Sequence, residues 1–184
     1  MKNVLIAIAL FILVAGCAKQ QGAPAFTITD DVGRTIGFTK HPGRIVSLAP
    51  NTTEMIYALG GQDRLVGVTS WCNYPPEAKE KPVIGDAISF NAEKLLALKP
   101  DLVIMVGTRQ SPALARLEAL DVPALALDPK TPEEILADII KIGRALGAEP
   151  KADSLINEIR TTLAWIKNAA DSCPDSQRPL VFAE

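Results

Sequence analysis

Histidine and cysteine side chains, the residues most suited to nucleophilic or metal chemistry, are few in this sequence. The one histidine, His41, lies in a Lys-His-Pro-Gly segment with the composition of a turn, so we expect a solvated surface side chain and not a catalytic base. Together with three cysteines it supplies too few soft ligands for a zinc site. The nucleophile-elbow, phosphate-loop, dinucleotide and zinc-protease motifs are also absent. These absences argue against an enzyme.

Cys17 differs from the other cysteines because it ends a short apolar segment. Lys2 precedes an uncharged run over residues 4–16, which is shorter than the roughly 20 apolar residues of a spanning helix. The pattern predicts a secretory signal peptide at residues 1–16. Residues 14–17 (VAGC) resemble the lipobox of bacterial lipoproteins, which implies cleavage before Cys17 and a lipid on its thiol. The alternative is an uncleaved anchor helix with an incidental cysteine.

The two other cysteines are predicted to stay unpaired. An exported compartment permits disulfides, but Cys72 lies in a loop and Cys173 follows a long helix. No feature of their spacing brings them together. We therefore favour two free thiols over a bridge.

Composition and charge place the chain among ordinary globular proteins. Of the 184 residues, 48% are apolar and 22% are charged, which excludes general disorder. The formal net charge is -2, and lysine and arginine form no basic run. Because phosphate binding needs a basic stripe, we expect no nucleic-acid partner.

Periodicity predicts an alternation of strands and helices after a flexible tether at residues 17–25. Residues 26–29 and 34–38 alternate apolar and polar side chains around a turn and predict a hairpin. The further segments read as strands are 45–48, 65–69, 101–106 and 123–127. The segments read as helices are 51–59, 91–99, 112–120 and 131–146, with caps predicted at Asn51, Asn91 and Thr131, a core-facing stripe at Ile135, Leu136, Ile139, Ile140 and Leu146, and a stop at Gly147.

This alternation predicts an α/β fold: a three-layer, Rossmann-like lobe over residues 26–148, with a parallel sheet covered by helices on both sides. Ligands bind such sheets beyond the carboxyl ends of the strands. The candidate loops are therefore 49–52, 70–76 and 107–111. They contribute the candidate ligand-binding residues Asn51, Trp71, Tyr74 and Thr108.

A long helix follows this lobe. Apolar residues at steps of three and four predict it over residues 149–172, with a length of roughly 30 Å. Residues 178–184 (RPLVFAE) then read as the beginning of a strand. We expect residues 173–184 to begin a second lobe that is missing from this chain, and the sequence to be a fragment.

Five segments, in order, resemble the substrate-binding proteins of ABC importers for vitamin B12, iron siderophores and haem, whose two lobes are joined by one long helix. These segments are 44–54 (RIVSLAPNTTE), 66–69 (VGVT), 74–76 (YPP), 91–94 (NAEK) and 98–104 (LKPDLVI). The resemblance extends from about Phe26 to Glu184. It implies small closure around the ligand and release controlled by a permease.

The resemblance also implies roles for single residues. Glu93 matches the family's permease-docking carboxylate, although a Glu in a first helical turn is stabilised by the helix dipole in any case. Trp71 matches an aromatic position that contacts the corrin ring in the B12-binding members; the alternative is a tryptophan packed on its own lobe. Asn51 is either a ligand contact or a simple cap closed by Glu54, and we assign Glu54 to structure.

The sequence thus predicts a lipid-anchored, extracytoplasmic solute-binding protein that delivers cobalamin or a related metal chelate to an ABC permease dimer. The alternatives are a siderophore or haem binder of the same class and, from another class, a lipid-anchored α/β enzyme or sensor. We expect a monomer in the periplasm or on the outer face of the membrane, with no resident metal and no covalent group except the lipid on Cys17.

Overall fold

A four-stranded parallel sheet forms the centre of the computed structural model, which describes residues 23–174 and residue 178. The strand order is β4-β3-β5-β6, and all three pairings are parallel. The strands are β3 (Ile45–Ser47), β4 (Leu65–Gly67), β5 (Leu102–Val106) and β6 (Ala124–Leu127). A separate antiparallel hairpin consists of β1 (Phe26–Thr29) and β2 (Thr35–Phe38).

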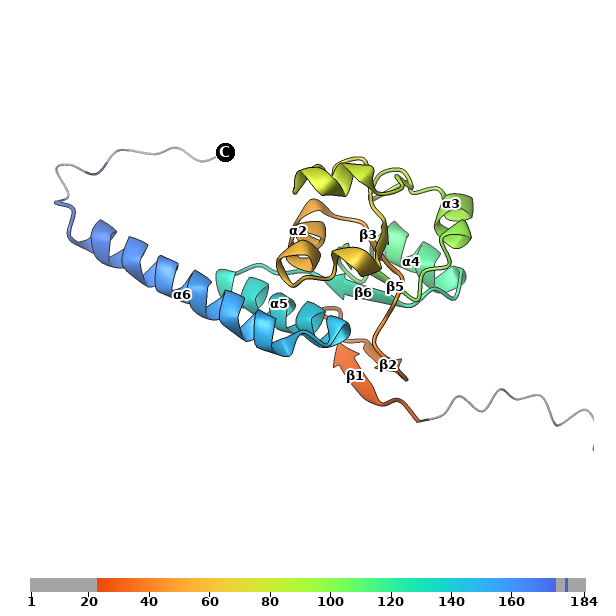
Figure 1. Cartoon of the computed structure of the whole chain (residues 1–184), viewed down its shortest axis with the longest axis horizontal. Helices are drawn as coiled ribbons and strands as arrows, with labels where there is room; N and C mark the ends of the chain where they lie inside the picture. The colour runs from red at the N-terminus through yellow and green to blue at the C-terminus, as the bar shows by residue number, and fades with distance from the viewer. Residues whose placement is uncertain (1–22, 175–177, 179–184) are drawn as a thin grey trace, which may run out of the picture.

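Helices alternate with these strands as the periodicity predicted (Figure 1). The α-helices are α2 (Pro50–Ala58), α3 (Ala92–Ala97), α4 (Pro112–Ala119), α5 (Pro132–Leu146) and α6 (Glu149–Asp171). Two short 3-10 helices, η2 (Gln62–Arg64) and η3 (Pro76–Glu80), were not predicted. Each is a single irregular turn, too short for hydrophobic periodicity to register.

Two hydrophobic clusters, one on each side of the sheet, confirm the three-layer prediction. Along β5, Leu102 and Ile104 belong to the cluster under α2, α5, α6 and the hairpin. Val103 and Met105 belong to the cluster under α3 and α4. Successive side chains of a strand point to opposite faces, so a strand buried on both faces reads as the continuous apolar run found here.

The local signals at three helix ends are confirmed. The Asn91 side chain accepts a hydrogen bond of 2.9 Å from the backbone N–H of Lys94. Thr131 and Glu134 form the predicted capping box. Gly147 ends α5 in the left-handed conformation, with φ at 62°. These signals depend on neighbouring residues only, which is why the sequence reveals them.

Two local predictions were wrong. Asn51 does not cap α2: the helix begins one residue earlier, at Pro50, and Ala49 is the N-cap. Proline suits a first helical position because its φ is already helical and its missing N–H would have no partner there. On α5, Ile135 and Ile140 are exposed and do not join the buried stripe.

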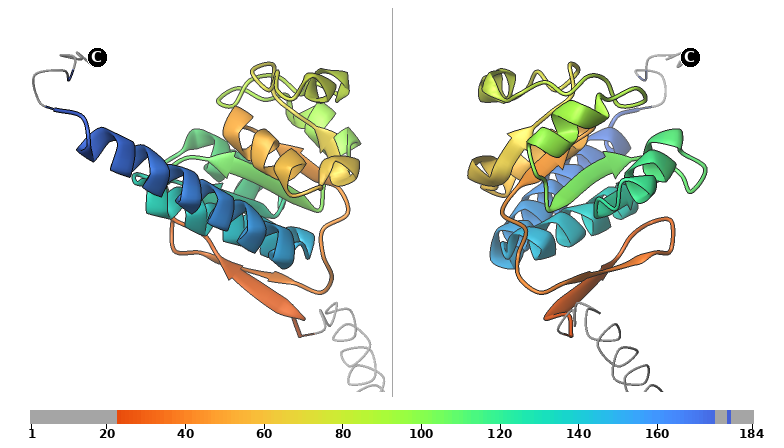
Figure 2. Two further views of the ribbon diagram at one scale, coloured as in Figure 1. Left: turned by 60° about the vertical axis from the view of Figure 1, so that its left-hand side comes forward. Right: turned by 90° about the vertical axis from the view of Figure 1, so that its right-hand side faces the viewer.

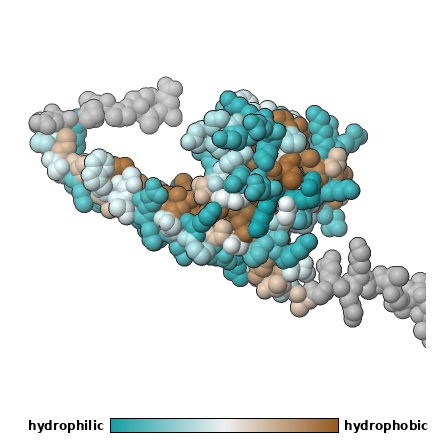
Figure 3. All heavy atoms as spheres, in the orientation of Figure 1, coloured by the Kyte–Doolittle hydropathy of each residue, from teal (hydrophilic) through white to brown (hydrophobic). Residues whose placement is uncertain are grey.

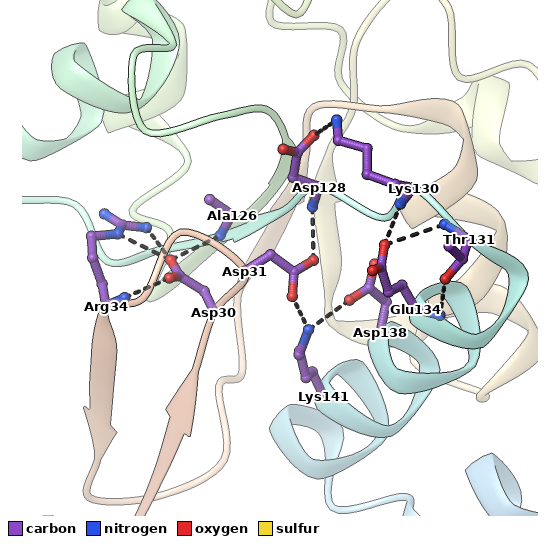
Figure 4. A network of polar contacts seen from close by, with 10 residues as sticks. All are labelled: Asp30, Asp31, Arg34, Ala126, Asp128, Lys130, Thr131, Glu134, Asp138 and Lys141. Atoms are coloured by element: carbon purple, nitrogen blue, oxygen red, sulfur yellow. Dashed lines mark hydrogen bonds and ion pairs between the residues drawn. The ribbon is translucent and has the colours of Figure 1, made fainter.

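The hairpin covers the open edge of β6 (Figure 4). Asp31 donates its backbone N–H to Ala126 O at 3.1 Å, and its carboxylate accepts from Asp128 N at 2.7 Å. Arg34 donates to Ala124 O at 2.8 Å and binds the buried Asp30 carboxylate at 2.6 Å. The turn of the hairpin therefore satisfies backbone groups that a further strand would otherwise pair with.

Helix α6 lies along α5 and then extends beyond the lobe (Figures 1 and 2). Ala152 and Ile156 are buried against the lobe, whereas every residue from 160 to 171 is exposed. Among the described residues, no helix has the length and apolarity needed to cross a membrane. Cys72 and Cys173 are both free thiols, as predicted. The predicted signal peptide, lipidated Cys17 and strand at 179–184 lie outside the described residues.

Candidate functional site

The carboxyl ends of the four parallel strands bring the three candidate loops to one edge of the sheet. Strand β3 is central and leads first to β4 on one side, after which the chain returns to β5 on the other side. The order therefore reverses between β3 and β5, and ligands of open α/β sheets bind at such a reversal. The loop after β5, which carries Thr108, and the connection from β3 into the first turn of α2, which carries Asn51, flank this point.

Buried hydroxyl groups fix the loop after β3. Ser47 Oγ lies 2.6 Å from Thr52 Oγ1, and Thr53 Oγ1 donates to Ser47 Oγ at 2.8 Å. Thr52 Oγ1 donates to the carbonyl oxygen of Ala49 at 3.0 Å, and Thr53 Oγ1 lies 3.1 Å from the same oxygen. The three hydroxyl-bearing residues are buried, whereas Asn51 between them is exposed. Asn51 is thus free to contact a ligand from a rigid turn.

The loop after β4 presents two aromatic side chains to solvent. Trp71 is 68% exposed and Tyr74 is 62% exposed. The backbone beneath them is held by hydrogen bonds from Ser70 N to Gly85 O at 2.9 Å and from Cys72 N to Thr69 O at 3.1 Å. The Cys72 thiol is buried, 3.2 Å from Thr69 Oγ1. Trp71 therefore does not pack on its own lobe, which was the alternative to ligand contact.

The loop after β5 is tied down at both ends. Gly107 donates its N–H to Leu127 O at 2.9 Å, and Ser111 donates to Thr108 O at 3.0 Å. Gly107 has a φ of +159°, and a Cβ there would lie 3.2 Å from Met105 and Ser111 atoms. The tip of this loop, including Thr108, is exposed.

A fourth segment at this edge was missed by the sequence interpretation. Residues 85–90 are joined to the Trp71 loop through Gly85, and Ile88 within them is 78% exposed. Asp86 holds the turn by accepting from Ile88 N, Ser89 N and Ser89 Oγ at 2.6–2.8 Å. The Ser89 and backbone hydrogen bonds lower the pKa of Asp86. The Asp-x-x-Ser spacing was the available signal, because such carboxylates commonly nucleate turns.

Glu93 occupies the first turn of α3 and is exposed. Within the described part of the chain, its carboxylate forms no ion pair or hydrogen bond. The Asn91 cap fixes the backbone of this turn. Glu93 is thus a positioned and uncompensated negative charge.

The assembled edge is suited to binding and not to bond chemistry. It combines exposed aromatic, apolar, amide and hydroxyl side chains, and His41 lies at the opposite edge, before β3, where its Nδ1 is 3.3 Å from Ala145 O. The His41 ring also contacts Phe26, with ring centroids 4.8 Å apart. Over residues 23–174 and residue 178, no cluster of acidic, histidine or cysteine side chains is arranged to hold a metal ion.

Comparison with known proteins places this arrangement in a family. Residues 45–184 match the periplasmic binding protein family. An uncharacterized ABC transporter substrate-binding lipoprotein of Bacillus subtilis is 35% identical over 188 residues, which cover 94% of this chain and 60% of that protein. A vitamin B12-binding protein of Pectobacterium carotovorum is 42% identical over 132 residues, covering 71% of this chain and 48% of that protein.

A solved structure gives the same picture. The periplasmic haem-binding protein of Pseudomonas aeruginosa superimposes with a TM-score of 0.63 at 32% identity, over 72% of this chain and 50% of that one. The chain therefore spans roughly half to three fifths of the length of the proteins that it matches. These relatives are solute-binding proteins and not enzymes, in agreement with the absence of catalytic motifs.

Proposed function

Because this chain belongs to the periplasmic binding protein family, we propose that it captures a metal chelate outside the cytoplasm and delivers it to an ABC-importer permease. The observation that carries the proposal is the carboxyl edge of the sheet, where Trp71 and Tyr74 are exposed on a fixed loop after β4, the strand next to β3. Large aromatic side chains held in water have unfavourable solvation, which a flat apolar ligand relieves.

The ligand that we propose first is cobalamin or a related corrinoid. A corrin ring is broad and weakly polar, so that stacking and apolar contact supply most of its affinity, with few directed hydrogen bonds. Trp71 and Tyr74 provide the apolar contact, and Asn51 and Thr108 provide polar groups on either side of the reversal. The name of the Pectobacterium relative supports this ligand.

Haem or an iron siderophore is the second candidate, and the haem-binding structure from Pseudomonas aeruginosa supports it. Both candidates place a flat or compact chelate against the same aromatic loop. They differ in charge, since haem and many siderophores carry carboxylates. A ligand panel therefore separates them.

Tryptophan fluorescence offers a direct test. The sequence contains two tryptophans, so a Trp165→Phe variant leaves Trp71 as the single reporter. Titration with cyanocobalamin, haemin and a ferric siderophore should quench this emission saturably for one of them, and calorimetry should give the same Kd. If calorimetry on the full-length protein, including the proposed second lobe, also shows no binding of any of the three, the chelate-binding proposal is wrong.

Delivery requires contact with the permease, and we propose Glu93 for this contact. An exposed carboxylate on a capped helical turn suits a charge-assisted pair with an arginine of the partner. Rim charges act mainly on association rate and on its salt dependence. Glu93→Arg should therefore weaken binding to the permease, because it sets two like charges against each other, while ligand affinity and melting temperature stay nearly the same. Normal transport by this variant would contradict the role.

We propose attachment to the membrane through a lipid on Cys17. The lipobox-like sequence and the lipoprotein name of the Bacillus subtilis relative support this. A doubly or triply acylated terminus binds a bilayer stably, whereas one acyl chain gives only marginal binding.

A further inference from the structure

Beside Glu93 the structure has an open pocket of about 280 Å³ that the ligand edge does not include. Its lining residues are Pro82, Val83, Ile84, Lys94, Ala97 and Leu98. Apart from the lysine, all of these side chains are apolar. The pocket lies between the second half of α3 and the segment that runs beside β4.

Exposed apolar side chains extend this pocket across the surface. Val83 and Leu96 are each 45% exposed, and Ala97 is exposed as well. Figure 3 shows hydrophobic side chains at the surface of the lobe away from α6 as well as along α6. An apolar depression with apolar residues at its margin has the character of an interface centre, because truncating such contacts costs the most binding energy.

The walls of the pocket are rigid. Val68 donates its N–H to Pro82 O, and Ile84 donates to Val68 O, both at 3.0 Å, so this wall is hydrogen bonded to the sheet. Asn91 donates to Ile84 O at 2.7 Å, which ties the beginning of α3 to the same wall. A preformed pocket loses little conformational freedom when a partner binds.

Helix geometry places the pocket next to the docking carboxylate. Residues three and four apart lie on the same side of a helix, with Cβ atoms roughly 5–6 Å apart. Glu93 is therefore adjacent to Leu96 and Ala97. One segment of a partner can reach both the charge and the pocket.

We propose that this pocket, together with Glu93, forms the docking site for a permease segment that inserts one aliphatic or aromatic side chain next to an arginine. The inference rests on the proposed delivery function and extends it from a single ion pair to a composite site. The arginine pairs with Glu93, while the apolar side chain fills the space between Val83 and Ala97. An exposed ion pair alone contributes little net affinity, so the apolar insertion supplies the larger share.

The test fills the pocket from an exposed helical position. Ala97→Leu changes helix propensity little and places a branched side chain in the cavity. Ala115→Leu on α4 is the matched control, because Ala115 is also an exposed helical alanine. Binding to the ABC permease–ATPase complex, reconstituted in nanodiscs, is measured by interferometry. The melting temperature of each variant is measured as well.

We expect Ala97→Leu to weaken permease binding at least tenfold, with the salt dependence unchanged, and Ala115→Leu to behave as the wild type. Glu93→Gln should instead reduce the salt dependence. If Ala97→Leu binds as tightly as its control while Glu93→Arg fails, the pocket proposal is wrong and the docking role of Glu93 stands. If neither Ala97→Leu nor Glu93→Arg affects binding, the proposal that the permease docks at α3 is wrong altogether. A photo-crosslinker at Leu96 that links only to a second copy of the chain would also overturn the proposal.

Discussion

Asp138 is the residue whose charge state is most sensitive to its surroundings. Its side chain is buried on α5, where Oδ1 accepts from Lys141 at 2.8 Å and Oδ2 has no hydrogen-bond partner. Lys141 also pairs with Asp31 of the hairpin, so two carboxylates share one ammonium group (Figure 4). Glu134, Asp128 and Lys130 lie around this cluster. Burial, with a contribution from the Asp31 charge, raises the pKa of Asp138 to about 6.

This pKa predicts a loss of stability between about pH 4 and pH 6. The folded state keeps a proton that the unfolded state has released, so the free energy of unfolding falls as the pH rises through this window. Asp138→Asn lacks this titration. Between pH 4.5 and pH 7 its free energy of unfolding, measured by urea unfolding, should therefore rise relative to that of the wild type by on the order of 1–3 kcal/mol. Parallel pH profiles for the two proteins would contradict the prediction.

The pKa of Asp31 is shifted in the opposite direction, so its ionisation changes the free energy of unfolding in the opposite sense and in a different pH range. Partial burial raises its pKa, but the hydrogen bonds from Lys141 and from Asp128 N outweigh burial and hold the pKa below the usual value. Its contribution to stability is present at neutral pH and is lost only as the pH falls below about 4. The two carboxylates therefore act on stability mainly in different pH ranges, although both pair with Lys141.

In the full-length protein, Trp71→Ala should weaken ligand binding about tenfold or more. Aromatic stacking contributes roughly 0.5–1.5 kcal/mol beyond the burial of area, and about 1.4 kcal/mol corresponds to one decade in Kd. Ile140→Ala, which removes an exposed apolar side chain from α5, is the control. Calorimetry on both variants measures the effect, and equal affinities would assign Trp71 no part in binding.

The sequence predicted which loops form the candidate site better than it predicted the role of each residue. Trp71 and Tyr74 follow a strand and are therefore placed by topology alone. Asn51 was ambiguous because an asparagine after Pro50 satisfies the pattern of a cap as well as that of an exposed loop residue. The structure excludes the cap, since α2 begins at Pro50 with Ala49 as its N-cap, and contact of Asn51 with a ligand stays a prediction.

At the scale of elements, the hairpin and β6 depend on one buried ion pair. The Asp30 side chain has no solvent exposure and is bound by Arg34 through Nε and Nη2. Backbone N–H groups of Arg34 and Ala126 complete its hydrogen bonds. A buried charge that loses its partner is costly, typically by roughly 3–5 kcal/mol.

Arg34→Met should therefore destabilise the lobe by about 2–4 kcal/mol. This is somewhat less than the usual cost of stranding a buried charge, because two backbone N–H groups still donate to Asp30. The double variant Asp30→Asn/Arg34→Met removes the stranded charge and should recover part of the loss. Urea unfolding of both variants measures the difference. A single variant within about 0.5 kcal/mol of the wild type, a typical effect of a neutral surface change, would show that the pair does not hold the hairpin.

Element types were largely predictable because their signals are local. The continuous apolar run of β5 and the caps of α3 and α5 needed no knowledge of distant residues. The exposure of Ile135 and Ile140 was not predictable in the same way, because the sequence shows an apolar stripe wider than the surface that the sheet and α6 cover. The edge contacts of the hairpin also escaped prediction, since they join residues about 90 positions apart in the chain.

At the scale of the whole molecule, α6 extends from the lobe past the carboxyl edge of the sheet, where the candidate ligand site lies. Helix α5 begins after the carboxyl end of β6, and α6 packs on α5 after the turn at Gly147. The second half of α6 therefore passes the edge that carries Trp71. Leu163 and Ile166 are exposed there and continue the stripe of Ala152 and Ile156. We propose that a second lobe covers this stripe and closes the ligand site from the other side.

The position of the molecule in the cell depends on Cys17 in our proposal. Residues 17–25 can span at most about 30 Å at the reach of an extended chain, so a lipid on Cys17 would hold the hairpin within that distance of the membrane. Cys17→Ser should release the protein from the membrane fraction, whereas Cys173→Ser, the control, should leave it bound. Mass spectrometry of the wild type should show a diacylglyceryl group on an amino-terminal Cys17. Retention of Cys17→Ser at the membrane, or an intact Met1 on the mature protein, would contradict lipid attachment, and the permease would then have to recruit the protein from solution.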